Sequence, residues 1–237
     1  MGNVSIVTTI ATMIAWVTIL AIVYVTYRKM QDKPKFWKVI VVTLIGTFSF
    51  IINIDLFGTS VRLPTLPLGV LILMILFMYN SERWKTYRSF AWIGFIGQFV
   101  FLFMSLLAIP FNHFIYPADE PSTYIADTSD ASVIPTHPSA EEFSFDENVL
   151  NEQIHTLKRE TIYSDQWYEE VSVSMTPIGD DMDERFPYFL DGVEPKWGSG
   201  INSALYIEKD GKGLLVSTPE AQYYFRANQS LVKVGEQ

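Results

Sequence analysis

The sequence predicts two parts: a membrane α-helical domain of four transmembrane helices and a small α+β C-terminal domain with an antiparallel sheet. Four long apolar runs lie within residues 1–114, and apolar residues alternate with polar ones near the end of the chain. The first 111 residues carry nine basic and three acidic side chains, which give a net charge of +6. The remaining residues carry eight basic and 23 acidic side chains, which give a net charge of −15. Such a contrast in charge indicates two environments.

The four apolar runs lie at about 4–27, 39–57, 67–84 and 90–111. The first contains no charged residue, and at about 1.5 Å per residue it is long enough to span a bilayer core of about 30 Å. The third reaches that length only if Pro67 is the first helical residue. This position suits proline, because its missing N–H would be unpaired there in any case. Each run therefore predicts one transmembrane helix.

Basic residues indicate the orientation of the four runs. The segment 28–38 has five bases and one acid, and the segment 81–88 has three bases and one acid. Short basic loops remain on the cytoplasmic side of a membrane, so we expect the N-terminus and the C-terminal domain outside. The sequence thus predicts a multi-pass protein of the plasma membrane. The absence of cysteine outside and the short basic loops inside are typical of a bacterial protein.

Four polar residues lie in or beside the apolar runs: Asn53, Asp55, Arg62 and Gln98. Asp55 follows Lys38 by 17 residues, about 25 Å of helix, which places it near the outer headgroups. A water-exposed turn is favoured over an ion pair of Asp55 with Arg62 inside the membrane, because charges there are costly. If the two residues do pair, they fix the hairpin between the second and third runs. Asn53 and Gln98 could form hydrogen bonds between helices.

The segment 115–142 has four prolines and many Ser, Thr and Asp residues, which predicts a disordered linker. An acidic extracytoplasmic domain is expected at 143–237. Its predicted elements are a helix at 148–163 capped by Asp146, and a strand at 169–175. A long connection at 179–200 follows. A four-strand meander is then expected at 204–209, 214–218, 221–227 and 230–234, with an Asp-Gly turn between the first two of these strands.

The acidic cluster of Asp180, Asp181, Asp183 and Glu184 is a candidate calcium site. Carboxylate oxygens are the ligands that Ca²⁺ prefers. The spacing does not match a helix–loop–helix calcium motif, however, and a solvated acidic loop is the favoured interpretation. The sequence therefore predicts no cofactor and no metal as part of the fold.

Four aromatic residues, Trp167, Tyr188, Phe189 and Trp197, are candidates for a ligand surface. The last three lie in the expected connection, and binding residues concentrate on loops. The alternative is that they form the core, which is the usual place for aromatic residues in a small domain without cysteine.

The histidines, His113, His137 and His155, are too dispersed in the sequence to predict one catalytic site, and no enzyme is expected. The acidic C-terminal half argues against nucleic acid as a partner. Two functions remain. The first is a membrane-anchored accessory or sensor protein whose domain binds another membrane or extracytoplasmic protein. The alternative is a component of a transporter or channel with a regulatory tail.

Overall fold

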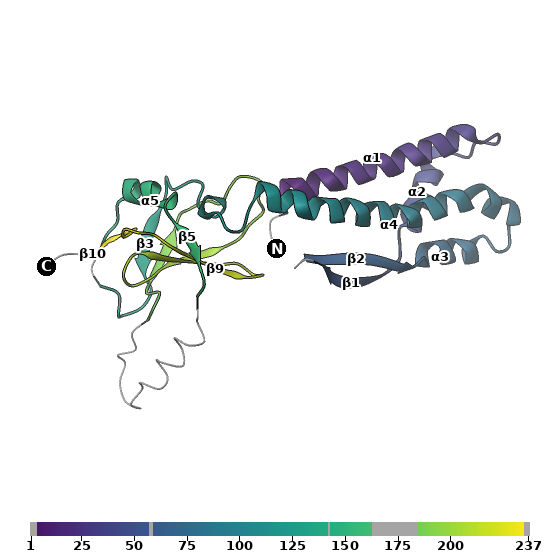
Figure 1. Cartoon of the computed structure of the whole chain (residues 1–237). Coiled ribbons are helices and arrows are strands. Elements are labelled where there is room, and N and C mark those ends of the chain that lie inside the picture. The colour runs from purple at the N-terminus through teal and green to yellow at the C-terminus, as the bar shows by residue number, and fades with distance from the viewer. Residues whose placement is uncertain (1–3, 57–58, 142, 163–183, 235–237) are drawn as a thin grey trace, which may run out of the picture. The chain divides into compact units, whose positions relative to one another are not determined.

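A computed structural model of the chain describes residues 4–56, 59–141, 143–162 and 184–234 (Figure 1). The chain forms two compact units. We call residues 6–112 the N-terminal unit, and residues 113–237 with the first five residues the C-terminal unit. The architecture is mixed α+β, with helices and one hairpin in the first unit and antiparallel sheets in the second.

Two helices of the N-terminal unit, α1 (Ile6–Lys29) and α4 (Ser81–Ile115), are long and apolar enough to cross a membrane. The 35 residues of α4 extend about 52 Å, more than the bilayer core requires. In each helix only 17% of the most apolar window is buried. A narrow stripe of α1 provides its buried contacts, at Ala15, Ile19 and Val23. Most of the apolar surface of both helices is therefore exposed, unlike that of a core helix in a soluble protein.

The structure corrects the helices expected at 39–57 and 67–84. Helix α2 (Phe36–Gly46) has 11 residues and α3 (Leu68–Leu76) has nine, so each covers about half of a bilayer core. Strands β1 (Phe50–Leu56) and β2 (Thr59–Leu66) form an antiparallel hairpin between them. Hydropathy reports that a run is apolar but does not separate strand from helix. The β-branched residues of 50–56 favour a strand, and each strand of a two-stranded hairpin is an edge that tolerates Pro64.

Glycines allow the backbones of the short helices to approach α4 and each other. A Cβ atom added at Gly94 would lie 2.2 Å from the carbonyl oxygen of Thr43, and one at Gly46 would lie 2.3 Å from that of Ala91. A Cβ atom at Gly69 of α3 would lie 1.7 Å from a carbonyl oxygen of α2. Any side chain at these positions would collide with backbone. Such contacts are the usual way in which helices associate in a membrane, where burying apolar surface gives no advantage over lipid.

The C-terminal unit contains a six-stranded antiparallel sheet with the strand order β3-β6-β7-β8-β9-β5. A two-stranded sheet pairs β4 with β10, and short helical segments η1 and α5 complete the unit. The strands of the larger sheet, in chain order, are β3 (Ser132–Pro135), β5 (Lys158–Glu160), β6 (Tyr188–Asp191), β7 (Ala204–Ile207), β8 (Gly213–Ser217) and β9 (Gln222–Arg226). The remaining elements are η1 (Pro121–Thr123), β4 (Phe143–Ser144), α5 (Glu147–Ile154) and β10 (Lys233–Val234).

Three strands of the expected meander are confirmed as β7, β8 and β9, and the turn after β7 has Gly211 at a φ of +72°. The fourth, β10, pairs instead with β4. Strand β6 lies within the segment expected to be a connection. The strand expected at 169–175 lies outside the described residues.

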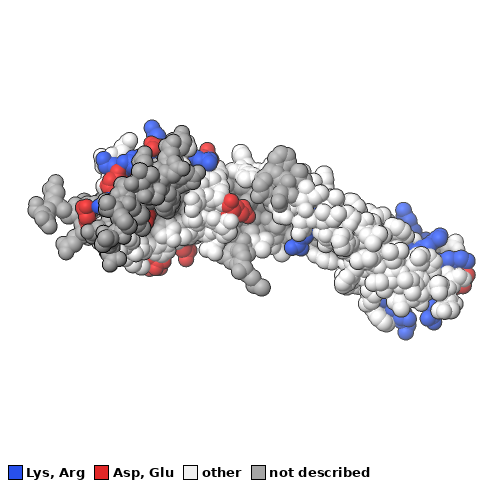
Figure 2. All heavy atoms as spheres, turned by 90° about the horizontal axis from the view of Figure 1, so that it is seen from below, with Lys and Arg blue, Asp and Glu red and all other residues white. Residues whose placement is uncertain are grey.

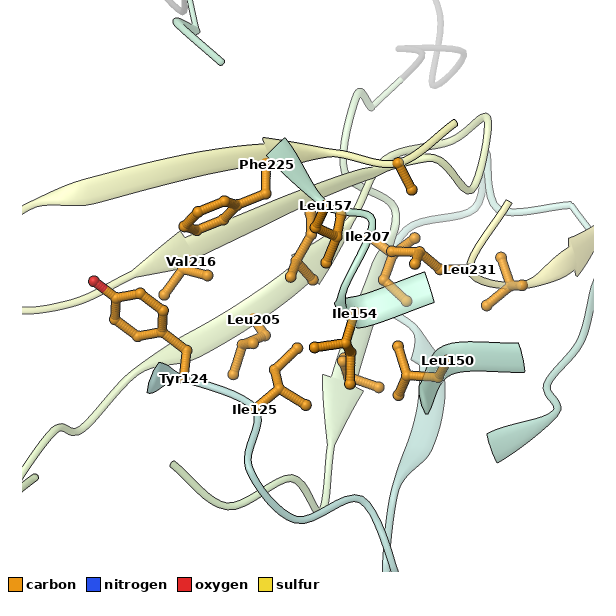
Figure 3. Packing of buried hydrophobic residues seen from close by; sticks show 14 of the residues in the cluster. Tyr124, Ile125, Leu150, Ile154, Leu157, Leu205, Ile207, Val216, Phe225 and Leu231 are labelled. Atoms are coloured by element: carbon orange, nitrogen blue, oxygen red, sulfur yellow. The ribbon is translucent and has the colours of Figure 1, made fainter. Parts of the chain in front are cut away.

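Helix α5 contributes to the main hydrophobic core of this unit (Figure 3). As expected, Asp146 caps the helix, because its carboxylate accepts a hydrogen bond from the backbone N–H of Asn148 at 3.0 Å. Leu150 and Ile154 are buried in the core. The helix ends at Ile154 rather than 163, and the next residues form β5, which pairs with β9 at the edge of the sheet. The expected helix was thus too long.

The expected linker is also corrected, because most of 115–142 belongs to the fold. Strand β3 pairs with β6 at the edge of the six-stranded sheet. Tyr124 and Ile125 are 3% and 2% exposed and belong to the core cluster. The composition of the segment is rich in Pro and Ser, and a short strand with two core side chains changes that composition very little. Composition alone therefore did not reveal them. The C-terminal unit therefore begins near the end of α4, not at residue 143.

A fragment beginning at Tyr116 should fold, whereas one beginning at Phe143 should not. The shorter fragment lacks β3 and the buried side chains of Tyr124 and Ile125. Each large buried apolar side chain contributes about 1.5–3 kcal/mol. Urea denaturation monitored by near-ultraviolet circular dichroism measures both fragments. In the longer fragment, replacing Tyr124 and Ile125 with Ala should also destabilise the domain. Equal urea midpoints for the two fragments would contradict this account.

Glycine substitutions in α4 test the close contact with α2. We expect Gly94→Ala to destabilise the protein by about 1–3 kcal/mol, because the added methyl group collides with backbone. Gly97→Ala is the matched control, since the atoms nearest to its added Cβ belong to the side chain of Ile19, at 2.8 Å and beyond, and not to backbone. Both changes raise helix propensity equally. Thermal unfolding in detergent should therefore show a lower Tm for Gly94→Ala than for Gly97→Ala, and a reversed order would refute the contact.

Candidate functional site

A groove of about 490 Å³ on the C-terminal unit is lined mainly by residues 193–203, which we call the Trp197 loop. The side chain of Trp197 is 81% exposed. Its ring is large and mostly apolar, with one N–H donor, so it offers both apolar area and a polar group to a partner. Polar side chains of Ser199, Asn202 and Ser203 also line the groove. The loop thus presents an aromatic ring beside polar groups.

The backbone of the Trp197 loop is held by hydrogen bonds to residues 123–127. Glu194 forms an isolated β-bridge with Asp127, and the backbone N–H of Lys196 donates to the carbonyl oxygen of Thr123 at 3.0 Å. Gly198 and Gly200 have φ values of +75° and +69°, which side chains of L-residues disfavour. These contacts fix the path of the loop, so its shape does not depend on the indole ring.

Two further contacts join the loop to the end of α4, within the same unit. The ammonium group of Lys196 donates to the carbonyl oxygen of Ile115 at 3.1 Å, which satisfies one of the last carbonyl groups of the helix. The hydroxyl of Tyr116 donates to the carbonyl oxygen of Trp197 at 3.1 Å. The backbone of Trp197 is therefore anchored, while its ring remains available to a ligand or partner.

The surroundings of the loop are polar but nearly balanced in charge. Glu194 and Lys196 both line the groove, and their formal charges cancel. Nearby, the backbone N–H of Ser129 donates to the carboxylate of Asp127 at 3.0 Å and lowers the pKa of that carboxyl group. Burial raises the pKa of the Tyr124 hydroxyl, and the neighbouring Tyr223 raises it further. Because the charges of Glu194 and Lys196 cancel, the groove favours neither a strongly anionic nor a strongly cationic ligand.

The structure separates the aromatic residues predicted to form one ligand surface. Tyr188 is fully buried, and its hydroxyl donates to the carbonyl oxygen of Glu141 and accepts from its N–H. Phe189 is half-buried against Tyr206, with ring centroids 5.4 Å apart. Trp167 lies outside the described residues. Tyr188 therefore belongs to the core, as the alternative interpretation of these aromatic residues predicts, and among the described members of the set Trp197 is the exposed one.

The candidate calcium ligands Asp180, Asp181 and Asp183 lie outside the described residues. The fourth, Glu184, accepts a hydrogen bond from the backbone N–H of Phe186 at 3.3 Å. Its own backbone N–H donates to the hydroxyl of Ser139 at 3.1 Å. Within the described residues, no three His, Asp or Glu side chains are grouped to hold a metal ion.

The polar residues of the apolar runs also occupy separate positions. In the β1–β2 hairpin, Asn53 pairs in register with Arg62, and Asp55 with Ser60, so Asp55 and Arg62 are not directly opposite. The side-chain amide of Gln98 donates to the carbonyl oxygen of Thr47 at 3.0 Å. Thr47 follows the last residue of α2, so this side chain of α4 satisfies a backbone carbonyl group at the end of that helix.

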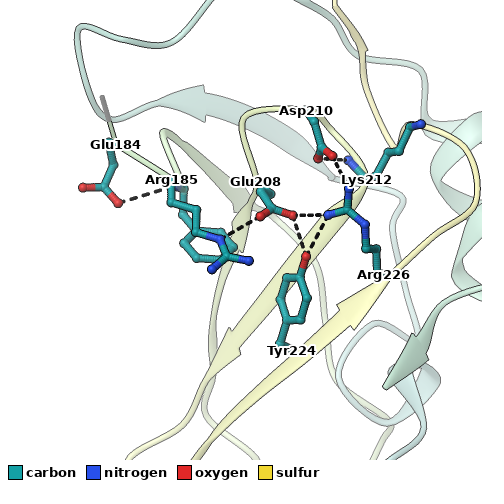
Figure 4. A network of polar contacts seen from close by, with 8 residues as sticks. Glu184, Arg185, Glu208, Asp210, Lys212, Tyr224 and Arg226 are labelled. Atoms are coloured by element: carbon teal, nitrogen blue, oxygen red, sulfur yellow. Dashed lines mark hydrogen bonds and ion pairs between the residues drawn. The ribbon is translucent and has the colours of Figure 1, made fainter. Parts of the chain in front are cut away.

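A polar network that the sequence did not predict surrounds Glu208 (Figure 4). This nearly buried carboxylate accepts from the guanidinium of Arg185 at 2.7 Å, from that of Arg226 at 2.5 Å and from the hydroxyl of Tyr224 at 2.5 Å. Arg226 also contacts Asp210. Two carboxylates and two guanidinium groups balance one another, so the network has the character of a structural ion-pair cluster rather than an open binding site.

The network requires a glycine opposite it. A Cβ atom at Gly213 would lie 2.1 Å from a carboxylate oxygen of Glu208 and 2.7 Å from the hydroxyl of Tyr224. Burial and the hydrogen bond with Glu208 raise the pKa of Tyr224. A sequence signal does exist: Tyr224 and Arg226 are two residues apart in a strand, and side chains at that spacing share one face. The buried carboxylate that joins them comes from Glu208, directly after β7, and has no local signature.

No protein-family model, curated protein or solved structure matches this chain.

Substitutions in the C-terminal unit test whether the ring of Trp197 is free of the fold. We expect Trp197→Ala to change the free energy of unfolding by less than about 0.5 kcal/mol, because the side chain is exposed. Tyr188→Ala is the contrasting variant, and it should cost about 3–5 kcal/mol because a buried ring is removed. Urea denaturation of the fragment from Tyr116 measures both. If Trp197→Ala cost more than about 1 kcal/mol, the ring would be structural and unavailable for binding.

Proposed function

We propose that this chain is a polytopic membrane-anchored accessory or sensor protein that presents a small acidic extracytoplasmic binding domain. The observation that carries the proposal is the division of the chain into two units of opposite character. The N-terminal unit contains α1 and α4, with mostly exposed apolar surfaces, and the C-terminal unit has its own core and sheet.

Exposed apolar surface supports a membrane location for the N-terminal unit. Large apolar side chains at high exposure include Met13, Val17, Ile96 and Phe103, in the middle of α1 and α4. Soluble proteins rarely expose continuous apolar patches of this extent, because the contact with water is unfavourable. In the proposed arrangement α1 and α4 each cross the bilayer, and α2 and α3 are too short to do so as helices alone.

The distribution of charge supports the proposed orientation. Figure 2 shows Lys and Arg side chains gathered at one end of the N-terminal unit, with almost uncharged surface along its length. The basic segments 28–38 and 81–88 flank this end, since residues of both line one cavity there. With basic loops on the cytoplasmic side, the C-terminal unit is exported.

The Trp197 loop supports a binding role for the exported unit. Tryptophan is enriched among residues that dominate protein–protein binding, and a backbone fixed in advance reduces the entropic cost of binding. In the proposal, the indole ring inserts into another membrane or extracytoplasmic protein, and Asn202 and Ser203 form polar contacts around it. No catalytic step is assigned to the loop.

Cysteine labelling in intact cells tests the proposed topology. The chain has no native cysteine, so Lys85→Cys and Glu220→Cys each provide one reactive thiol at an exposed position. With a membrane-impermeant maleimide, we expect labelling at position 220 in intact cells and at position 85 only after permeabilisation. Labelling at position 85 but not at position 220 would invert the topology and refute an extracytoplasmic binding domain.

A further inference from the structure

A cavity in the N-terminal unit carries an inference about a ligand. We propose that it binds one anionic phospholipid, with the headgroup at Lys38 and Arg83 and an acyl chain along the apolar walls. This inference rests on the proposed membrane location of the unit and adds a specific lipid-binding site to it.

The cavity lies between α2, α3 and the first turns of α4, and its volume is about 510 Å³. Volumes of about 300–1,000 Å³ are typical of small-molecule sites. Its walls are mainly aliphatic and aromatic, and they include Val41, Ile45, Leu73, Leu76 and Tyr87. Such walls suit a hydrocarbon chain and offer few partners to a polar ligand.

Charged side chains also line this cavity. Lys38 of α2 and Arg83 of α4 both line it, together with Glu82. The carboxylate of Glu82 accepts from the ammonium group of Lys85 at 3.0 Å, so its charge is already matched within α4. In the part of the chain that the structure describes, neither Lys38 nor Arg83 forms an ion pair with a carboxylate. Two cations therefore remain to attract an anionic group.

The positions of these cations favour a lipid over a soluble anion. Both lie in the segments that the charge pattern assigns to the cytoplasmic side, where anionic lipids accumulate. Basic pockets between membrane helices on that side are a recurrent way of binding anionic headgroups. A zwitterionic headgroup would bring its ammonium group towards two like charges, so discrimination against phosphatidylcholine follows from the same geometry. A free phosphate would gain nothing from the apolar walls.

Lipid retention by the purified full-length protein tests the site. The protein in detergent is titrated with phosphatidylglycerol or phosphatidylcholine that carry identical acyl chains, and bound lipid is counted by native mass spectrometry. We expect one tightly retained phosphatidylglycerol. Each basic residue near an anionic surface contributes about 1 kcal/mol, so Lys38→Gln with Arg83→Gln should weaken retention about 30-fold. Lys29→Gln with Lys33→Gln removes the same charge away from the cavity and should leave retention unchanged.

A second variant and a soluble competitor keep the result interpretable. Val41→Trp should fill the cavity from an exposed wall position and reduce retention without any change of charge. Glycerol phosphate should not displace the lipid. Equal retention of both lipids, equal loss in the two double variants, or displacement by glycerol phosphate would each overturn the site. Cysteine labelling remains a separate test: a wrong membrane topology alters labelling, whereas a wrong lipid site leaves it intact.

Discussion

The contact between the backbones of α2 and α4 is the constraint on which the N-terminal unit depends. Gly46 and Gly94 remove the side chains that would separate the two helices. This approach brings Gln98 within hydrogen-bonding distance of the carbonyl group of Thr47, so the end of α2 is satisfied by α4 rather than by water. The same packing places the start of α2 beside the start of α4, and so brings Lys38 and Arg83 to one cavity. The proposed lipid site is thus a consequence of helix packing.

The C-terminal unit depends on a segment whose Pro-, Ser-, Thr- and Asp-rich composition predicted a disordered linker. Residues 121–135 provide a sheet strand, two core side chains and the backbone partners of the Trp197 loop. The carbonyl oxygen of Thr123 and the bridge at Asp127 hold that loop at its start. If this segment were a free linker, the loop would lose its support and Trp197 its fixed position. Core and candidate binding surface therefore share the same short stretch of chain.

Local patterns predicted the elements that local interactions determine. Short apolar runs separated by turn residues, with an Asp-Gly turn between the first two, identified the β7–β8–β9 meander, and the cap at Asp146 identified the start of α5. The sequence could not show that the apolar run after Gly46 is a strand, because hydropathy measures transfer from water and not backbone conformation. Nor could it show that Tyr188 is buried while Trp197 is exposed, since both lie in one aromatic-rich segment and tertiary pairing decides between them.

The Trp197 loop and the cavity lined by Lys38 and Arg83 differ from the Glu208 network in one respect. Side chains of the network are already paired with one another, whereas Trp197, Lys38 and Arg83 belong to no such network in the part of the chain that the structure describes. Glu208 is a nearly buried carboxylate. Two guanidinium groups and a hydroxyl donate hydrogen bonds to its oxygens, so few acceptor positions remain for a ligand. Trp197 is the reverse case, with an anchored backbone and an exposed ring. Lys38 and Arg83 resemble it, because they border an apolar cavity without a carboxylate partner among the described residues. The Glu208 network is therefore structural, and the Trp197 loop and the cavity lined by Lys38 and Arg83 are the candidate binding sites.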